Sequence, residues 1–139
     1  MNDLETFIAQ KLHEPFKYGV NDCITFSAEA IRLATGIDHL KDIKKWNSEM
    51  QASKLLDKMG YKSLTDVIDS RFRQHTNINK LKDGDVVTAE QTLDKRFNEL
   101  ALIYYQGYLL GPAKDGLHKC EVSEGKNFFN VRSLRLGYA

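Results

Sequence analysis

The 139-residue sequence is poor in the residues that build covalent or metal-centred frameworks. It has two cysteines, Cys23 and Cys120, which are too few for a disulfide framework. Together with four scattered histidines they offer no short ligand spacing for structural zinc, and no glycine-rich loop is present to cradle a phosphate. We therefore expect two free thiols in a reducing compartment, and neither a metal nor a cofactor.

Long apolar runs and an excess of one charge are also missing. No stretch approaches the roughly 20 apolar residues that cross a bilayer, and the opening MNDLETFIAQKL has neither the basic start nor the apolar core of a secretory signal. Twenty Lys and Arg residues oppose nineteen Asp and Glu residues, for a formal net charge of +1, so no global field attracts nucleic acid or anionic lipid. We expect no membrane span, no nucleic-acid partner, and synthesis in a cytoplasm without a signal peptide.

What the sequence does contain changes character near its middle. Up to about residue 72 the apolar residues recur at helical spacing, and from about residue 83 they form short strand-like runs between tight turns. A helical half (1–72) followed by a sheet half (83–139) predicts one α+β domain over residues 1–139, because alternating α and β units would interleave. Helices are predicted over 3–13, from 23 to a terminating Gly36, and over 48–59 and 63–71. Strands are predicted from 86 and over 99–105, 108–110, 117–122, 128–131 and 134–138.

The start of the second predicted helix carries a candidate nucleophile. Asn21 or Asp22 can cap this helix, and Cys23 follows in its first turn. The helix is nearly apolar all round, which is typical of a buried helix. Partial positive charge at a helix start stabilises a thiolate, so Cys23 can act as a nucleophile if a base lies nearby and a cleft exposes it. The alternative is an inert buried cysteine, because apolar surroundings raise the pKa of a thiol.

Several short elements follow one another along most of the chain: Phe16-Lys17-Tyr18-Gly19, Asp22-Cys23, Thr35-Gly36-Ile37-Asp38, Gly84-Asp85-Val86, and Gly111-Pro112 with Gly116-Leu117. In this order they resemble the NlpC-type superfamily of papain-like cysteine peptidases and amidases, which cut peptidoglycan stem peptides. They are most similar to a small family of phage and prophage tail-associated domains with a Phe-x-Tyr-Gly-x-x-Asp-Cys element. The resemblance implies a papain-like α+β fold, with N-terminal helices packed on a C-terminal antiparallel sheet.

The chain departs from the active members of that superfamily at the catalytic base. Their base is a histidine that begins the first strand of a hairpin. When that hairpin is laid over the one predicted around Gln106-Gly107, Glu99 occupies the histidine position and Gly111 falls near the residue that orients the base. A carboxylate beside Cys23 would disfavour the thiolate by like-charge repulsion, and it is a weak base at neutral pH. His118, on a later strand, is the remaining candidate base.

The resemblance implies two possible functions, and we consider a third as well. The chain is expected to be a structural component of a phage or prophage tail tip or baseplate, with a decayed catalytic site. It would be made in the host cytoplasm, reside in the virion tail and bind other tail-tip or baseplate hub proteins.

The alternative is an active cysteine peptidase or amidase that cleaves peptidoglycan stem peptides during genome entry. Cys23 would be its nucleophile, and His118, or a histidine of a neighbouring subunit, its base. In the third function the chain is a free-standing host adaptor that binds a peptide in the former catalytic cleft without cleaving it. We favour the structural role over the enzyme, because covalent catalysis needs an activated nucleophile and the sequence offers no evident base.

Overall fold

The computed structural model describes residues 3–74, 77–91, 99–124 and 131–138. Within these residues four α-helices come first and a five-stranded sheet follows, which confirms the predicted α+β class. The elements are α1 (Asp3–Lys11), α2 (Cys23–Thr35), α3 (Glu49–Lys58), α4 (Leu64–Arg71), η1 (Ile78–Lys80), β1 (Val86–Gln91), β2 (Glu99–Tyr105), β3 (Tyr108–Ala113), β4 (Gly116–Glu121), η2 (Val122–Glu124) and β5 (Val131–Tyr138).

The strands of the sheet lie in the order β4-β3-β2-β1-β5, and each neighbouring pair is antiparallel. The predicted hairpin joins β2 to β3. Gln106 and Gly107 both have positive φ, 47° and 89°, as a two-residue turn needs to match the twist of its strands. The register pairs Tyr105 with Tyr108 next to this turn. Glu99 therefore lies at the opposite end of the hairpin from its turn.

Several observed boundaries differ from the predicted ones, the largest differences being at the end of α1, at the end of β3, and at the start of β5, which begins at Val131 rather than at residue 134. α1 ends at Lys11 rather than His13. The chain then turns through a hydrogen bond from Glu14 N to Lys11 O (3.2 Å), since Pro15 cannot continue a helix. β3 extends beyond the predicted residue 110 to Ala113, because it pairs with β4 along its whole length. The strand predicted over 128–131 falls almost wholly outside the described residues.

The sheet buries apolar residues on both of its faces. On the face against α2, Phe26 and Ile103 are 1% and 0% exposed. Burying a side chain as large as Phe26 stabilises the fold by roughly 1.5–3 kcal/mol. The cluster on the opposite face comprises Leu81, Val87, Ala89, Leu102, Leu109, Cys120 and Val122. Neighbouring residues of one strand alternate between the two clusters, as strand geometry requires.

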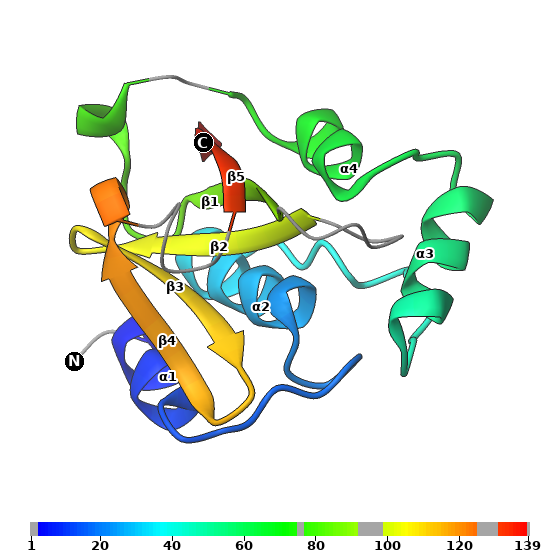
Figure 1. Cartoon of the computed structure of the whole chain (residues 1–139), viewed down its shortest axis with the longest axis horizontal. Helices are drawn as coiled ribbons and strands as arrows, with labels where there is room; N and C mark the ends of the chain where they lie inside the picture. The colour runs from blue at the N-terminus through cyan, green and yellow to red at the C-terminus, as the bar shows by residue number, and fades with distance from the viewer. Residues whose placement is uncertain (1–2, 75–76, 92–98, 125–130, 139) are drawn as a thin grey trace.

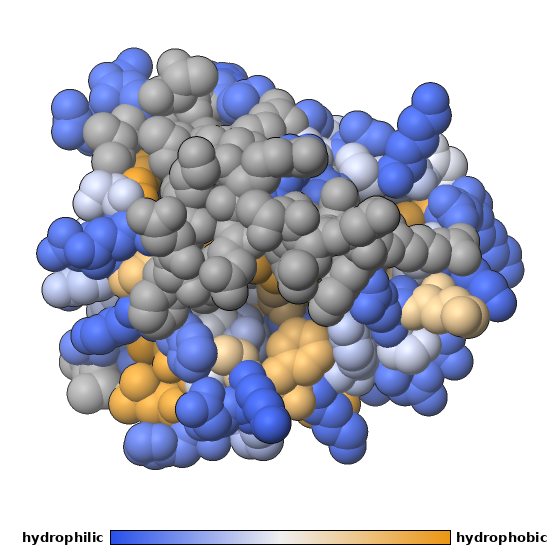
Figure 2. All heavy atoms as spheres, in the orientation of Figure 1, coloured by the Kyte–Doolittle hydropathy of each residue, from blue (hydrophilic) through white to orange (hydrophobic). Residues whose placement is uncertain are grey.

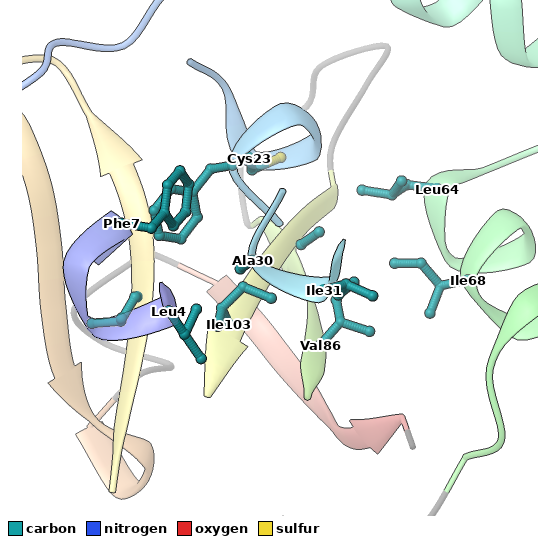
Figure 3. Packing of buried hydrophobic residues seen from close by; sticks show 12 residues of the cluster. Leu4, Phe7, Cys23, Ala30, Ile31, Leu64, Ile68, Val86 and Ile103 are labelled. Atoms are coloured by element: carbon teal, nitrogen blue, oxygen red, sulfur yellow. The ribbon is translucent and has the colours of Figure 1, made fainter. Parts of the chain in front are cut away.

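Helix α2 lies between α1 and α4, and α3 lies furthest out, beyond α4 (Figure 1). Figure 3 shows the same arrangement from close by, where Phe7 from α1 and Leu64 and Ile68 from α4 enter the cluster from opposite sides. Cys23 lies at the edge of this cluster, at the start of α2. α3 makes only sparse contacts with the other elements.

The coloured surface of Figure 2 is largely hydrophilic, with hydrophobic residues visible over α1 and β4 at the lower left. Leu12, just beyond the end of α1, is 46% exposed. Single exposed apolar residues of this kind are ordinary on a protein surface. Of the helices that the structure describes, none has the length and apolar character needed to span a bilayer.

Candidate functional site

Asp22 fixes the start of α2 and with it the position of Cys23. The Asp22 carboxylate accepts hydrogen bonds from the backbone N–H groups of Ile24 (3.0 Å) and Thr25 (2.8 Å). In return the Asp22 N–H donates to the Thr25 hydroxyl (2.9 Å). This reciprocal arrangement is a capping box, and it satisfies donors that a helix start otherwise leaves unpaired. The sequence left open whether Asn21 or Asp22 caps α2, and the structure shows that Asp22 is the cap.

The second oxygen of Asp22 connects the helix start to two other segments. Oδ2 accepts hydrogen bonds from the Gly19 N–H (2.8 Å) and from the Trp46 indole Nε1 (2.7 Å). Gly19 has a φ of +74°, and a Cβ there would lie 1.8 Å from the Trp46 carbonyl oxygen, so the loop needs glycine at this position. Asp22 is 3% exposed and has both oxygens engaged. It therefore serves as a structural anchor for Cys23.

Cys23 is the first residue of α2 and is 8% exposed. Burial raises the pKa of its thiol to about 12, a hydrogen bond with the backbone of Ala101 on β2 offsets part of the rise, and the charges of Asp22 and Glu99 add to it. A helix start favours a thiolate, but in this site burial outweighs that effect. The sulfur thus lies against the first strand of the hairpin, and at neutral pH it is a protonated, poorly nucleophilic thiol.

Glu99, the residue expected at the position of a catalytic histidine, is committed to α4. Its carboxylate accepts hydrogen bonds from the backbone N–H groups of Leu64 (2.9 Å) and Thr65 (3.2 Å), and from the Thr65 hydroxyl. These N–H groups open α4, so Glu99 acts as a cap supplied by a distant strand. Glu99 lines the same cavity as Cys23 and raises the thiol pKa, but its oxygens face α4.

The structure does not bring His118 to Cys23. β4 pairs Cys120 with Leu109, and both belong to the cluster on the face away from α2. His118 is two residues from Cys120 on the same strand and so points to that face as well. Its Nε2 lies 3.1 Å from Asp115 Oδ1, and this hydrogen bond lowers the pKa of the Asp115 carboxyl.

The other histidines provide no base either. His13 and His39 are absent from the lining of the Cys23 cavity, and His75 lies outside the described residues. A general base must come within hydrogen-bond reach of the proton that it removes. In the part of the chain that the structure describes, Cys23 therefore has no imidazole partner.

The cavity beside Cys23, which we call the Cys23 cleft, has a volume of about 210 Å³. Burial and then the charge of Glu49 raise the pKa of Tyr18, whose hydroxyl also forms a hydrogen bond with Glu49. No ammonium or guanidinium group lines the cleft among the described residues. Nor do those residues contain a group of three or more His, Cys, Asp or Glu side chains placed to hold a metal ion. The walls of the Cys23 cleft carry three aromatic side chains and three carboxylates: Phe16, Tyr18, Trp46, Asp22, Glu49 and Glu99.

A family model described as "Domain of unknown function (DUF6950)" matches residues 1–131. The chain belongs to this family. Neither the search of curated proteins nor the search of solved structures found a match. The region shared with DUF6950 runs from α1 to the start of β5 and so includes every side chain of the Cys23 cleft named above.

Two contacts of this DUF6950 domain were not predicted from the sequence. The Trp46 indole donates a hydrogen bond to the Asp22 carboxylate. Glu99 binds the first turn of α4, more than thirty residues earlier in the chain. The one available signal for the first contact was that Trp46 is the only tryptophan of the chain and lies in a charge-rich segment. No local sequence pattern could have predicted the contact between Glu99 and α4, because these residues are distant in the sequence and meet only in the folded chain.

Proposed function

We propose that this DUF6950 domain is a non-catalytic, structural component of a phage or prophage tail tip or baseplate. We further propose that its fold is papain-like, of the NlpC type, with a catalytic site that has lost its chemistry. The single observation that carries this proposal is the environment of Cys23. The thiol occupies a helix start against a hairpin strand, yet the residue at the position of the expected base is Glu99, which is bonded to α4.

The papain-like part of the proposal is supported by the order and packing of the elements. Helix α2 begins with Cys23 and packs against β2, the first strand of the hairpin. The sheet is antiparallel and follows the helices along the chain. Fold alone does not determine function, and a scaffold can persist after its chemistry is lost.

The non-catalytic part is supported by the state of the thiol. A cysteine nucleophile attacks as the thiolate, and active sites lower the thiol pKa with a neighbouring imidazolium or another positive group. In this chain burial raises the pKa of Cys23 to about 12, and the two charges that act on this pKa, those of Asp22 and Glu99, are negative. The thiolate is therefore a minute fraction of the population at neutral pH.

The location in a tail is supported by the sequence resemblance to phage and prophage tail-associated domains. The elements that carry this resemblance lie in places where the fold constrains them. Gly19 and Asp22 hold the start of α2. Gly116 approaches the end of α1 so closely that a Cβ would lie 2.4 Å from the Leu12 carbonyl oxygen. Such positions preserve a scaffold, which is what an assembly protein has to keep.

Enzymatic activity is tested by digestion of purified muropeptides, followed by mass spectrometry of the products. Three proteins are compared: wild type, Cys23→Ala, and the matched control Cys120→Ala. We expect no cleavage by any of them. Iodoacetamide at pH 7 should label neither cysteine of the folded wild type and both cysteines in urea. Cleavage by wild type and Cys120→Ala, but not by Cys23→Ala, would establish the peptidase instead. Binding of stem peptides without cleavage would favour the peptide-binding adaptor.

The structural role is tested in the genome that encodes the chain. We expect deletion of its gene to yield particles with incomplete tails, and purified tails of the parent to contain the chain. The Cys23→Ala protein should restore assembly and infectivity as fully as wild type. Tails that assemble normally without the chain would refute the structural role.

A further inference from the structure

A second cavity lies beside the Cys23 cleft, between α2, α3 and α4, and we call it the three-helix cavity. Trp46 and Ile24 line both cavities, so the two share a wall. Figure 3 shows Leu64 and Ile68 of α4 directed toward Ile31 of α2, and all three line the three-helix cavity. Its volume is about 90 Å³, whereas a water molecule takes up ~30 Å³ in the liquid. Protein interiors have few voids of that size.

Two polar side chains of the lining are already hydrogen-bonded to protein groups. The Ser27 hydroxyl donates to the Ala101 carbonyl oxygen on β2 (3.1 Å). The Trp46 indole Nε1 donates to Asp22, which lines the Cys23 cleft instead (2.7 Å). Each of these side chains has a single donor. Neither therefore has a proton left for a group inside the three-helix cavity.

His39 and Arg71 also line the cavity, but they bring little polar surface to it. Arg71 is exposed, and its Nη1 donates to the His39 carbonyl oxygen (3.3 Å). The His39 ring packs against Phe72, with the ring centroids 4.7 Å apart. Two buried side-chain atoms in the described part of the chain, Asn21 Oδ1 and Thr88 Oγ1, lack a hydrogen-bond partner, yet neither residue lines this cavity. The surface of the three-helix cavity is thus almost entirely hydrocarbon.

A hydrocarbon surface selects what the cavity can hold. A buried water needs about two to four polar partners, and a polar group that is buried without a partner is strongly disfavoured. Apolar cavities instead stay dry or bind apolar molecules, as an engineered cavity of ~150 Å³ binds benzene or xenon. The three-helix cavity is smaller than that one. It therefore suits a short alkane better than an aromatic ring.

The α3 side of the cavity gives a ligand access. Leu55, Leu56 and Met59, which form its α3 wall, are only half-buried. α3 lies apart from α2 and α4 (Figure 1), and its packing against the other elements is sparse. A small displacement of α3 therefore admits a ligand, and a bound ligand adds contacts between α3 and its neighbours.

We propose that the three-helix cavity binds a small, wholly apolar ligand of the size of a short alkane. The ligand lies among the apolar side chains of α2, α3 and α4 and joins α3 to the rest of the domain. It carries no hydrogen-bonding atom, because the cavity has no partner to offer one. This site is separate from the proposed tail role and does not depend on it.

The choice of ligand is tested by titrating the full chain with n-butane, 1-propanol and benzene. n-Butane and 1-propanol are matched in size and differ in the hydroxyl group. Methyl NMR follows Ile31 and Leu56, which line the cavity, with Leu109 on the opposite face of the sheet as the reference. We expect saturable shifts of Ile31 and Leu56 with n-butane and no shift of Leu109. Affinity should be at least tenfold weaker for 1-propanol and at least fivefold weaker for benzene.

Three variants test the location. Ala28→Leu fills the cavity from α2 and should weaken n-butane binding at least tenfold. The matched control Ala9→Leu, at an exposed position of α1, should leave n-butane binding unchanged. Leu56→Ala enlarges the cavity and should strengthen benzene binding at least fivefold. Circular dichroism verifies that each variant is folded.

Three results would overturn the proposal. They are equal affinities of wild type for n-butane and 1-propanol, the absence of saturable shifts at Ile31 and Leu56 with n-butane, and undiminished n-butane binding by folded Ala28→Leu. If Ala28→Leu does not fold, Leu56→Ala decides the location, and an unchanged benzene affinity in that variant would refute the site.

Discussion

The starts of α2 and α4 are both held by carboxylates, but these carboxylates come from different distances along the chain. Asp22 directly precedes α2 and bonds the N–H groups of Ile24 and Thr25. Glu99 reaches α4 from the beginning of β2 and bonds the N–H groups of Leu64 and Thr65. Both side chains are largely buried. One cap is local, and the other ties a helix to the sheet.

The difference supports the proposal that the candidate site is non-catalytic. The local cap holds Cys23 at a helix start, a position that can activate a thiol. The distant cap, Glu99, is the residue that the proposed papain-like fold places at the position of the base, and its carboxylate bonds α4 instead. A group that secures tertiary structure with both oxygens is not free to accept a proton from Cys23. If the proposed papain-like fold is correct, the helix start that carries the thiol is kept and the proton acceptor is replaced by a tertiary contact.

The largest expected effect comes from removing the local cap. Asp22→Ala leaves four donors without their acceptor: two N–H groups of α2, the Gly19 N–H and the Trp46 indole. We expect a loss of about 4 kcal/mol in the free energy of unfolding, since a lost cap costs about 1 kcal/mol and each buried unpaired donor about 1–3 kcal/mol. Urea denaturation measures it. Asp22→Asn keeps one acceptor oxygen and should lose about half as much; a loss below about 1 kcal/mol in Asp22→Ala would contradict the anchoring role.

Removing the distant cap should have a smaller and more local effect. Glu99→Ala leaves the Leu64 and Thr65 N–H groups unpaired, with an expected loss of about 2–3 kcal/mol. Hydrogen exchange should accelerate in the first turn of α4 and stay unchanged in α2. Glu121→Gln, which alters an exposed glutamate on β4, serves as the control. Uniform acceleration across both helices, or none in α4, would show that Glu99 does not act as the cap of α4.

The buried thiol predicts how stability depends on pH. Because the pKa of Cys23 is about 12 in the folded chain against an ordinary value of 9.0, the folded state retains a proton that the unfolded state releases. Stability should therefore be unaffected below about pH 9 and fall between pH 9 and 12, by up to about 1.4 kcal/mol per pH unit. Denaturant titrations at pH 8 and pH 10 compare wild type with Cys23→Ala. Cys23→Ala should lose less free energy of unfolding between pH 8 and pH 10 than wild type does. Equal losses in the two proteins would show that the Cys23 thiol is not the cause.

The fold class and most elements could be predicted because they depend on local patterns. Helical spacing gave way to strand patterns near the middle of the chain, and Gln106-Gly107 marked the hairpin turn. Gly19 and Gly116 were recognised as parts of motifs, and the structure supplies the steric reason. A Cβ at either position would collide with a backbone carbonyl oxygen from another segment. These glycines thus carry packing information that a single sequence cannot reveal.

The candidate site was predicted in part only. The sequence indicated a cysteine at a helix start and a glutamate on the facing strand, and Cys23 and Glu99 do line one cavity. It could not reveal that Glu99 turns to α4, since that contact joins residues 34 and 35 positions apart. The orientation of His118 was equally hidden, because it depends on the register of β4 against β3. Contacts between distant segments decided both outcomes.

The smallest effect sharpens the comparison between local and distant caps. Ser48 and Ser63 cap α3 and α4 in the same way, each through its hydroxyl oxygen and the backbone N–H three residues on, at 3.1 Å. Since α4 has Glu99 as well, Ser63→Ala should cost about 0.5 kcal/mol and Ser48→Ala about 1 kcal/mol. In a Glu99→Ala background the cost of Ser63→Ala should rise to about 1 kcal/mol, because the serine is then the remaining cap of α4. Urea denaturation of the double-mutant cycle measures this coupling, and strict additivity would mean that the two caps stabilise α4 independently.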